Sequence, residues 1–154
     1  MNNREFFDNN GYLYVPNMID VSTLRQEVPK ERGQITYYRK DKFDHNPIET
    51  QVNGSLSRWN YPEYKTSHFL VKQKVEELIN YNLLKTYFYD RFYFAGQQLD
   101  RHSDRPACEI SVTLQISSNQ KEPWPIWFET KDGREVFVNM KDGDGVIYRG
   151  CERE

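Results

Sequence analysis

The sequence predicts a mixed α+β fold that is mainly β, a β-sandwich or jelly roll with N-terminal helices packed on the sheet. The first observation is a series of short segments with a hydrophobic period of two, which begins at residue 84 and ends at residue 148. The second is that turn signals separate these segments at regular intervals. The third is one amphipathic helical pattern upstream of them, in place of the alternating strands and helices of a parallel sheet.

The N-terminal region contains one predicted strand and one short predicted helix. A turn signal at residues 7–11 leads into Tyr12–Val15, whose side chains favour a strand. Asp20 is a candidate N-cap for a helix over residues 21–28, which the following proline would end. Residues 30–64 are polar and show no regular pattern, but they contain many aromatic side chains that need packing partners. We therefore expect an ordered loop region without regular secondary structure.

The clearest helix of the sequence begins at Thr66 or Ser67 and ends at residues 80–82. Its apolar residues fall at positions i, i+4, i+7 and i+8, which places them on one stripe: Val71, Val75, Leu78 and Ile79. We expect this stripe to lie against the outside of a sheet.

Two long segments after the helix alternate in the manner of strands. The first covers residues 86–95. The second covers residues 108–117 and alternates more cleanly, with branched apolar residues on one face and Ser111, Thr113 and Gln115 on the other. We expect the polar face of this second segment to line a cavity.

The C-terminal third predicts a hairpin and one more strand. Residues 126–130 and 135–139 flank Lys131-Asp132-Gly133-Arg134, which is a hairpin signal because glycine accepts a positive φ angle. A turn at residues 142–145 leads into a strand at residues 146–148. We expect one domain over residues 1–154, with residues 1–83 as a helical support region and residues 84–154 as the β core.

The composition excludes several classes of protein. A net charge of −2 excludes the broad positive field of a general nucleic-acid binder. The mean hydropathy of −0.91 is low, but an aromatic content of 15% supplies enough buried area for a packed core. No apolar run reaches the roughly 20 residues of a membrane span, and the N-terminus lacks the apolar region of a signal peptide. With only two cysteines, we expect a cytoplasmic protein without disulfides.

The most informative motif is His102-Ser103-Asp104. In an extended strand, residues two apart project to the same side, so an imidazole and a carboxylate would face inward together. That pair is two thirds of the two-histidine, one-carboxylate set that holds non-haem Fe(II). No histidine follows His102 in the sequence, so we expect the set of ligands to be cut short. His45 and His68 are substitutes for the third ligand, although both positions are more typical of surface or capping histidines.

The surroundings of this motif resemble a known family. The matching segments are residues 54–59, 62–64, 93–96, 102–106, 108–111, 124–127 and 143–152. Together they are similar to the Fe(II)/2-oxoglutarate dioxygenases of the prolyl 4-hydroxylase type, in a compact branch common among viral and bacterial proteins.

This resemblance implies a double-stranded β-helix (jelly roll) with Fe(II) and 2-oxoglutarate as cofactors, and ascorbate as an optional third. His102 and Asp104 match the first two metal ligands, and Tyr93 matches a tyrosine that hydrogen-bonds the cosubstrate. We group Thr113 and Gln115 with Tyr93 as cofactor-binding residues. In the family, the distal histidine and the basic residue that binds 2-oxoglutarate follow a segment that here ends near Glu152, so we expect the final strands to be missing.

The expected function is hydroxylation in the full-length protein, since a carboxylate ligand favours hydroxylation over halogen transfer. We expect this chain itself to have little activity. The alternative is a non-catalytic jelly-roll binding module with a vestigial metal site. We expect a small-molecule or peptide substrate, whose identity the sequence does not specify, and no membrane. Nucleic acid is not expected as a partner, and the open sheet edge predicts a homo-oligomer.

Overall fold

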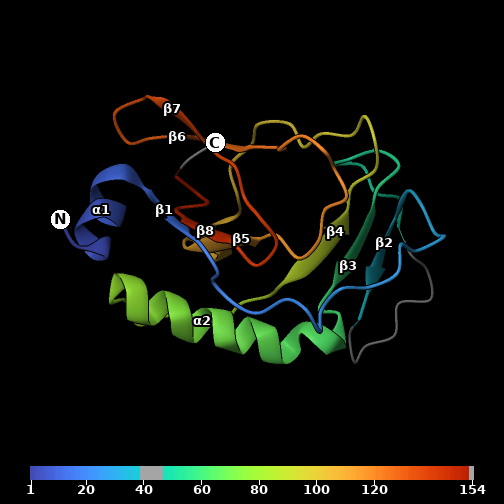
Figure 1. Ribbon diagram of the computed structural model, residues 1–154, viewed down its shortest axis with the longest axis horizontal. Coiled ribbons are helices and arrows are strands. Elements are labelled where there is room, and N and C mark those ends of the chain that lie inside the picture. The colour runs from blue at the N-terminus through green and yellow to red at the C-terminus, as the bar shows by residue number, and fades with distance from the viewer. Residues whose placement is uncertain (39–46, 153–154) are drawn as a thin grey trace. The chain divides into compact units, whose positions relative to one another are not determined.

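The computed structural model describes residues 1–38 and 47–152 (Figure 1). Over these residues the fold is mixed α+β and mainly β. Its elements are, in chain order, α1 (Asn3–Asn10), β1 (Tyr12–Val15), β2 (Gln34–Tyr37), β3 (Leu56–Trp59), the 3-10 helix η1 (Pro62–Tyr64), α2 (Lys65–Ile79), β4 (Tyr89–Phe92), the 3-10 helix η2 (Pro106–Cys108), β5 (Ser111–Leu114), β6 (Ile126–Glu129), β7 (Glu135–Val138) and β8 (Gly145–Tyr148). No helix in the described part of the chain is both long and apolar enough to cross a bilayer.

The chain forms two compact units that interleave in sequence. Unit 1 consists of Met1–Arg25, Phe69–Lys85 and His102–Glu154. Unit 2 consists of Gln26–His68 and Thr86–Arg101. Each unit therefore combines residues from both sides of residue 84.

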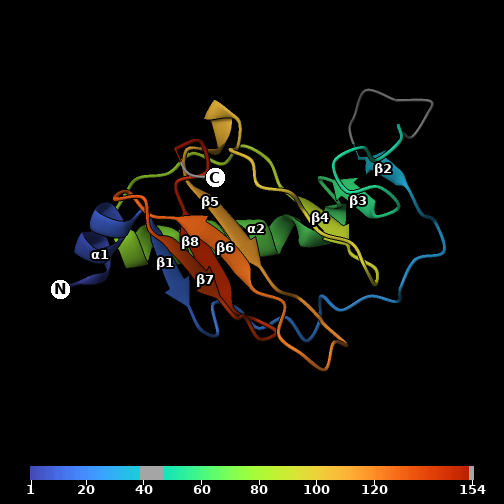
Figure 2. The same ribbon diagram turned by 90° about the horizontal axis from the view of Figure 1, so that it is seen from above.

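Unit 1 is built in three layers around a sheet with the strand order β1-β8-β5. Both strand pairs are antiparallel, and β8 is central. One face of the sheet packs against α1 and the Phe69–Ile79 part of α2, with Phe7, Val75, Ile79 and Ile147 fully buried or nearly so. The other face packs against the β6–β7 hairpin through Phe128, Val138 and Val146 (Figure 2).

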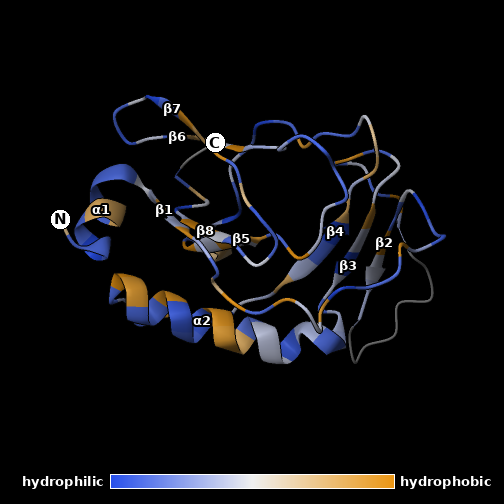
Figure 3. Ribbon diagram, in the orientation of Figure 1, coloured by the Kyte–Doolittle hydropathy of each residue, from blue (hydrophilic) through white to orange (hydrophobic). Residues whose placement is uncertain are grey.

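The amphipathic stripe of α2 confirms the predicted helix and its orientation. Val75 and Ile79 are buried in the core of unit 1, and Val71 and Leu78 pack against that core. The apolar and polar stretches alternate along this helix (Figure 3). The stripe lies against the sheet, as its periodicity predicts.

Helix α1 is an element that the sequence interpretation missed. Asn2 and Glu5 form a capping box, in which the Asn2 side chain accepts from the Glu5 N–H at 2.9 Å and the Glu5 carboxylate accepts from the Asn2 N–H at 3.1 Å. Gly11 ends the helix in the left-handed conformation, with φ of 81°. The turn signal at residues 7–11 is therefore the C-terminal end of a helix.

Unit 2 contains a sheet with the strand order β2-β3-β4. Strand β2 is parallel to β3, and β3 is antiparallel to β4. The prediction that residues 30–64 lack regular structure is therefore wrong, because β2 and β3 lie in this range. The prediction that the segment is ordered holds for its described residues. Much of β3 and β4 is coloured as hydrophilic in Figure 3, yet Ser57 and Arg58 of β3 are buried. A buried strand made of such residues shows no apolar alternation.

The predicted helix over residues 21–28 is wrong. Residues 22–24 form a turn, and residues 25–29 have no regular structure. The Asp20 side chain accepts a hydrogen bond from the Ser22 N–H at 2.9 Å, and Leu24 donates to the Val21 carbonyl, so the local bonds close a turn instead of starting a helix.

The strands after residue 84 are shorter than predicted. Only Tyr89–Phe92 of the segment 86–95 is a strand, and only Ser111–Leu114 of the segment 108–117. The hairpin is confirmed, with β6 and β7 paired antiparallel and Gly133 at a φ of 80° in its turn. The turn at residues 142–145 and the following strand β8 are confirmed as well.

Candidate functional site

His102 and Asp104 lie side by side in unit 1, on a segment of irregular backbone that precedes η2. The predicted extended strand at this point is wrong, but the two side chains meet: Nε2 of His102 is 3.4 Å from Oδ1 of Asp104. Their side chains keep 36% and 23% of their surface exposed, so the pair is accessible from solvent. Here proximity comes from the local chain path and not from the period of a strand.

Asp104 is fixed at both its backbone and its side chain. Its N–H donates to the Gly150 carbonyl at 2.6 Å. Its Oδ2 accepts from the Ser111 hydroxyl at 3.0 Å, and that hydroxyl also lies 3.1 Å from the Cys108 carbonyl. Since Oδ2 is held by Ser111, the other oxygen is the one that faces His102.

Gly150 leaves the space in which this arrangement fits. A Cβ at position 150 would overlap Asp104 Oδ2, and it would come within 2.5 Å of Ser111 Oγ and 2.7 Å of the Cys108 carbonyl oxygen. The residue is buried directly behind the carboxylate. Only glycine therefore allows the segment after β8 to pass so close to Asp104.

The two donor atoms fit adjacent positions on one metal ion. Ligands about 2.1 Å from a metal and at right angles to each other lie about 3 Å apart, close to the observed 3.4 Å. Imidazole nitrogen with carboxylate oxygen is also a donor set suited to Fe(II). Among residues 1–38 and 47–152, however, no three His, Cys, Asp or Glu side chains form a group that could hold a metal. The metal-ligand roles of His102 and Asp104 therefore stay predictions.

Ser111 and Thr113 share the face of β5 that is turned toward the hairpin layer. Ser111 pairs with Tyr148 and Thr113 with Val146, and opposite residues of an antiparallel pair project to the same side. The Thr113 hydroxyl lies 3.4 Å from the Tyr148 hydroxyl. Of the three polar residues predicted for this face, Ser111 contacts the carboxylate and Thr113 lies one rung further along the strand.

Gln115 lies apart from the His102–Asp104 pair. Its side chain donates to Asp142 at 3.1 Å, and its backbone bonds to the turn before β8. It lies four positions after Ser111 along the chain, which corresponds to about 13 Å in an extended backbone. The structure therefore gives Gln115 a role in holding the turn, and its predicted contact with a cofactor stays a prediction.

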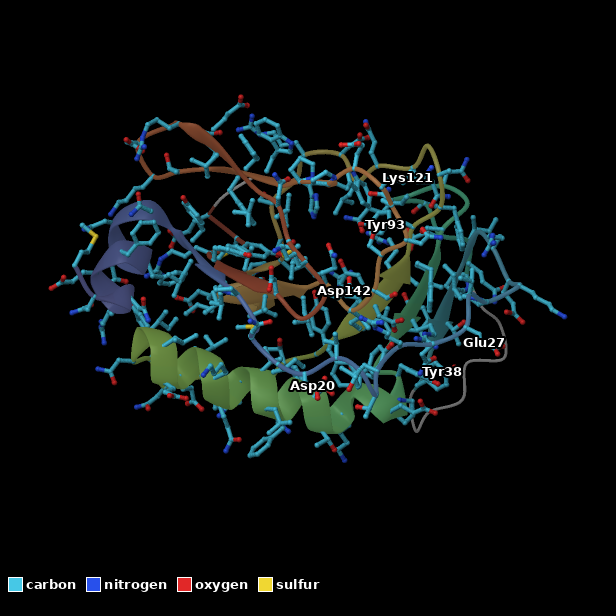
Figure 4. The ribbon with its side chains drawn as sticks, viewed as in Figure 1. Asp20, Glu27, Tyr38, Tyr93, Lys121 and Asp142 are labelled. Carbon is cyan, nitrogen blue, oxygen red and sulfur yellow. The ribbon has the colours of Figure 1, made fainter. Side chains whose placement is uncertain are left out.

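Tyr93 belongs to unit 2 and follows β4 directly (Figure 4). Its hydroxyl lies 3.2 Å from Arg91, whose guanidinium also donates to Ser57 at 3.0 Å and pairs with Glu49 at 3.4 Å. Burial alone would raise the pKa of Glu49, but hydrogen bonds from Ser57 and Gln51 and the charge of Arg91 bring it below its ordinary value. The tyrosine hydroxyl is thus part of a buried polar network, and its predicted role toward a cosubstrate remains untested.

The third-ligand role of the two substitute histidines stays a prediction. His68 lies in unit 2, where its ring packs on Phe88 with the centroids 4.8 Å apart. His45 falls outside the described residues. The sequence interpretation gave no role to Gly150, although this glycine lies within the resembling segment 143–152 and follows the predicted strand 146–148 by two residues.

Comparisons with known proteins find similarity at the level of the fold. No protein-family model matches the chain. No curated protein matches its sequence either. Among solved structures, the chain is similar to the crystal structure of a Pseudomonas putida prolyl-4-hydroxylase, with a TM-score of 0.61 and 12% sequence identity over 97% of this chain and 85% of that one. The chain therefore has a fold like that of a prolyl-4-hydroxylase.

Proposed function

We propose that the chain is an Fe(II)- and 2-oxoglutarate-dependent dioxygenase domain, a hydroxylase on a double-stranded β-helix. The observation that carries the proposal is the His102–Asp104 pair, whose donor atoms are 3.4 Å apart and whose carboxylate is fixed by Ser111 and Gly150. The layered unit 1 and the similarity to a prolyl-4-hydroxylase structure support it.

The role of this chain is to present two ligands in a fixed geometry. Ser111 holds Oδ2 of Asp104, which leaves Oδ1 as the donor atom that lies 3.4 Å from the imidazole Nε2. In a metal site, His102 would act as a ligand through Nε2. When bound, Fe(II) would supply the redox chemistry with oxygen and 2-oxoglutarate, and the protein would supply position and orientation.

The second candidate is a jelly-roll binding module with a vestigial metal site. The observation that favours it is the lack of a third ligand side chain near the pair among the described residues. The two candidates differ in one measurable property, since a module with a vestigial site would not bind metal through His102 and Asp104.

Metal binding to the intact chain separates these candidates. Calorimetric titration with Co(II), a redox-stable stand-in, and with Fe(II) under anaerobic conditions is expected to show one site. His102→Ala and Asp104→Ala should each weaken binding by at least tenfold. His68→Ala is the matched control and should leave the affinity unchanged, because His68 packs on Phe88.

Two further results bear on the proposal. A visible absorption change on adding 2-oxoglutarate to the Fe(II)-loaded chain, followed by succinate formation with oxygen, would support dioxygenase chemistry. An intact chain that binds neither Co(II) nor Fe(II), or one whose affinity does not depend on His102, would favour the binding module.

A further inference from the structure

The chain has two cysteines, one shortly before β5 and one shortly after β8. These two strands pair antiparallel, with Ser111 opposite Tyr148 at the end of the ladder. Continued by three residues along each segment, the same register would place Cys108 opposite Cys151. Directly opposite residues of an antiparallel pair have Cβ atoms about 4.5–5.5 Å apart, which is close to the spacing in a disulfide.

The two segments stay together where the regular ladder ends. The Asp104 N–H donates to the Gly150 carbonyl at 2.6 Å, and a Cβ on Gly150 would lie 2.7 Å from the Cys108 carbonyl oxygen. Cys151 follows in the turn 149–152, which one backbone hydrogen bond of 3.2 Å closes. The two cysteines therefore lie on adjoining segments of unit 1.

The distance between the two cysteines has an upper limit. The Gly150 Cα atom lies within about 4 Å of the Cys108 carbonyl oxygen, and neighbouring Cα atoms are about 3.8 Å apart. The Cα atoms of Cys108 and Cys151 are thus no more than roughly 10 Å apart, and a disulfide requires roughly 4.4–6.8 Å. Any remaining difference is a few ångströms within the turn 149–152.

We propose that Cys108 and Cys151 form a reversible disulfide when the protein meets a peroxide. Both residues carry thiols in the structure and are partly exposed, so a small oxidant can reach them. Hydrogen peroxide oxidises one thiol to a sulfenic acid: the O–O bond breaks, an S–O bond forms and water leaves. The second thiol attacks that sulfur, so that the S–S bond forms, the S–O bond breaks and a second water leaves. A dithiol reverses the reaction by exchange.

The disulfide would fix the surroundings of the Asp104 carboxylate. The Cys108 carbonyl accepts from the Ser111 hydroxyl at 3.1 Å, and Gly150 lies directly behind the carboxylate. A covalent link between Cys108 and Cys151 would hold both segments in place, and it would close a long loop in the unfolded chain. The oxidised chain should therefore unfold at a higher urea concentration than the reduced chain. None of this requires a bound metal, so the inference stands apart from the proposed function.

The test is oxidation of the intact, reduced chain with a small excess of hydrogen peroxide, followed by mass spectrometry of a tryptic digest. One crosslinked pair of peptides that carry Cys108 and Cys151 is expected, and dithiothreitol should separate it. The oxidised chain should stay monomeric on a non-reducing gel. Cys108→Ser and Cys151→Ser should each abolish the crosslink.

Equilibration with glutathione measures whether the fold brings the thiols together. The equilibrium constant for closing the disulfide should be at least tenfold larger in the folded chain than in about 8 M urea. Cys151→Ser combined with Glu152→Cys moves the thiol by one residue in the same turn, and it should lower the constant of the folded chain about tenfold. An equal constant in urea, equal closure by the displaced thiol, crosslinks between two copies, or oxidation without a crosslink would overturn the proposal.

Discussion

Unit 1 and unit 2 bury different kinds of side chain. The interior of unit 1 is mainly apolar, with Ile147, Val146 and Phe7 at 0% exposure, although Thr130 and Asp144 are buried there as well. The interior of unit 2 contains ionic pairs: Arg58 binds Asp90 through two nitrogens, with 11% and 13% of the two side chains exposed. In the same unit, burial, together with the nearby Asp90, raises the pKa of Tyr64 to about 12 (Tyr64 also contacts Arg58).

This difference determines how each unit responds to a lost side chain. Removing apolar atoms from unit 1 leaves a cavity, whose cost depends on how far the neighbours relax. Removing one charge from unit 2 leaves the opposite charge buried without its partner, which costs more than the pair itself contributes. Burial already raises the pKa of Asp90, although Arg58 partly offsets that shift.

The largest effect is expected from Arg58→Ala. It leaves the Asp90 carboxylate buried and removes the contact with the Tyr61 ring, 3.7 Å from the guanidinium. The free energy of unfolding should fall by about 4 kcal/mol. Urea unfolding monitored by circular dichroism measures it.

The double variant Arg58→Met with Asp90→Leu is the control for this prediction. Because it removes both charges and keeps apolar volume, it should recover most of the lost stability. If Arg58→Ala costs less than about 1 kcal/mol, the pair behaves as a surface ion pair and the contrast between the units fails.

A somewhat smaller effect is expected from Ile147→Ala in unit 1. Ile147 is fully buried on β8, between α2 and the neighbouring strands, and its loss should cost about 3 kcal/mol in urea unfolding. Ile147→Val removes a single methylene and should cost about 1 kcal/mol. Equal costs for the two variants would mean that the core repacks around the missing atoms.

The same contrast explains what the sequence can and cannot predict. The stripe of α2 and the alternation of β6 and β7 depend on apolar side chains, so their periods predict unit 1 well. Strand β3 has the sequence Leu-Ser-Arg-Trp, and two of its three buried positions are polar, because Ser57 bonds to Glu49 and Arg58 pairs with Asp90 of β4. Such partners are distant in sequence, so no local pattern reveals them.

The candidate site is predictable in its residue types but not in its geometry. The spacing of His102 and Asp104 correctly suggests neighbouring side chains, although their backbone is irregular. The support comes from Ser111 and Gly150, which are 7 and 46 residues away from Asp104 along the chain. Only the antiparallel pairing of β5 with β8 brings those two together.

Gly150→Ala tests how tightly unit 1 encloses the carboxylate. The added methyl group would overlap Asp104 and come within 2.7 Å of the backbone carbonyl of Cys108, which cannot rotate away. Overpacking of this kind should cost about 2 kcal/mol, and it should weaken Co(II) binding as well. Gly133→Ala is the control: it replaces a glycine in an open turn, where the positive φ strains any other residue, so it should lose stability without a change in metal affinity. Unchanged metal affinity in Gly150→Ala would show that the segment shifts freely.

Ser111→Ala tests the hydrogen bond that orients Asp104. Removing the hydroxyl frees Oδ2 to rotate, so Co(II) affinity should fall about tenfold, equivalent to about 1.4 kcal/mol. Thr113→Val is the matched control on the same face of β5, since its hydroxyl meets Tyr148 instead of the carboxylate. If both variants bind Co(II) like the unaltered chain, Ser111 has no part in holding the ligand.

The smallest effect is expected from Asp8→Asn, which tests a half-exposed ionic contact in unit 1 against the buried pairs of unit 2. The hydrogen bond from Tyr81 is the main cause that lowers the pKa of Asp8 below its ordinary 3.8; burial opposes it, and Arg149 supports it. A carboxylate with a lowered pKa stabilises the fold above its unfolded pKa, and this contribution is lost as the pH falls through the folded value.

The unaltered chain should therefore lose stability below about pH 4, partly because Asp8 becomes protonated. In Asp8→Asn the free energy of unfolding should fall less steeply as the pH is lowered through this range. At pH 7 the variant should cost less than about 1 kcal/mol, because Asp8 keeps 37% of its side chain exposed and solvent screens the pair. Urea unfolding at pH 3.5 and pH 7 measures both quantities. A cost at pH 7 as large as that of Arg58→Ala would mean that exposure does not distinguish the ionic contacts of the two units.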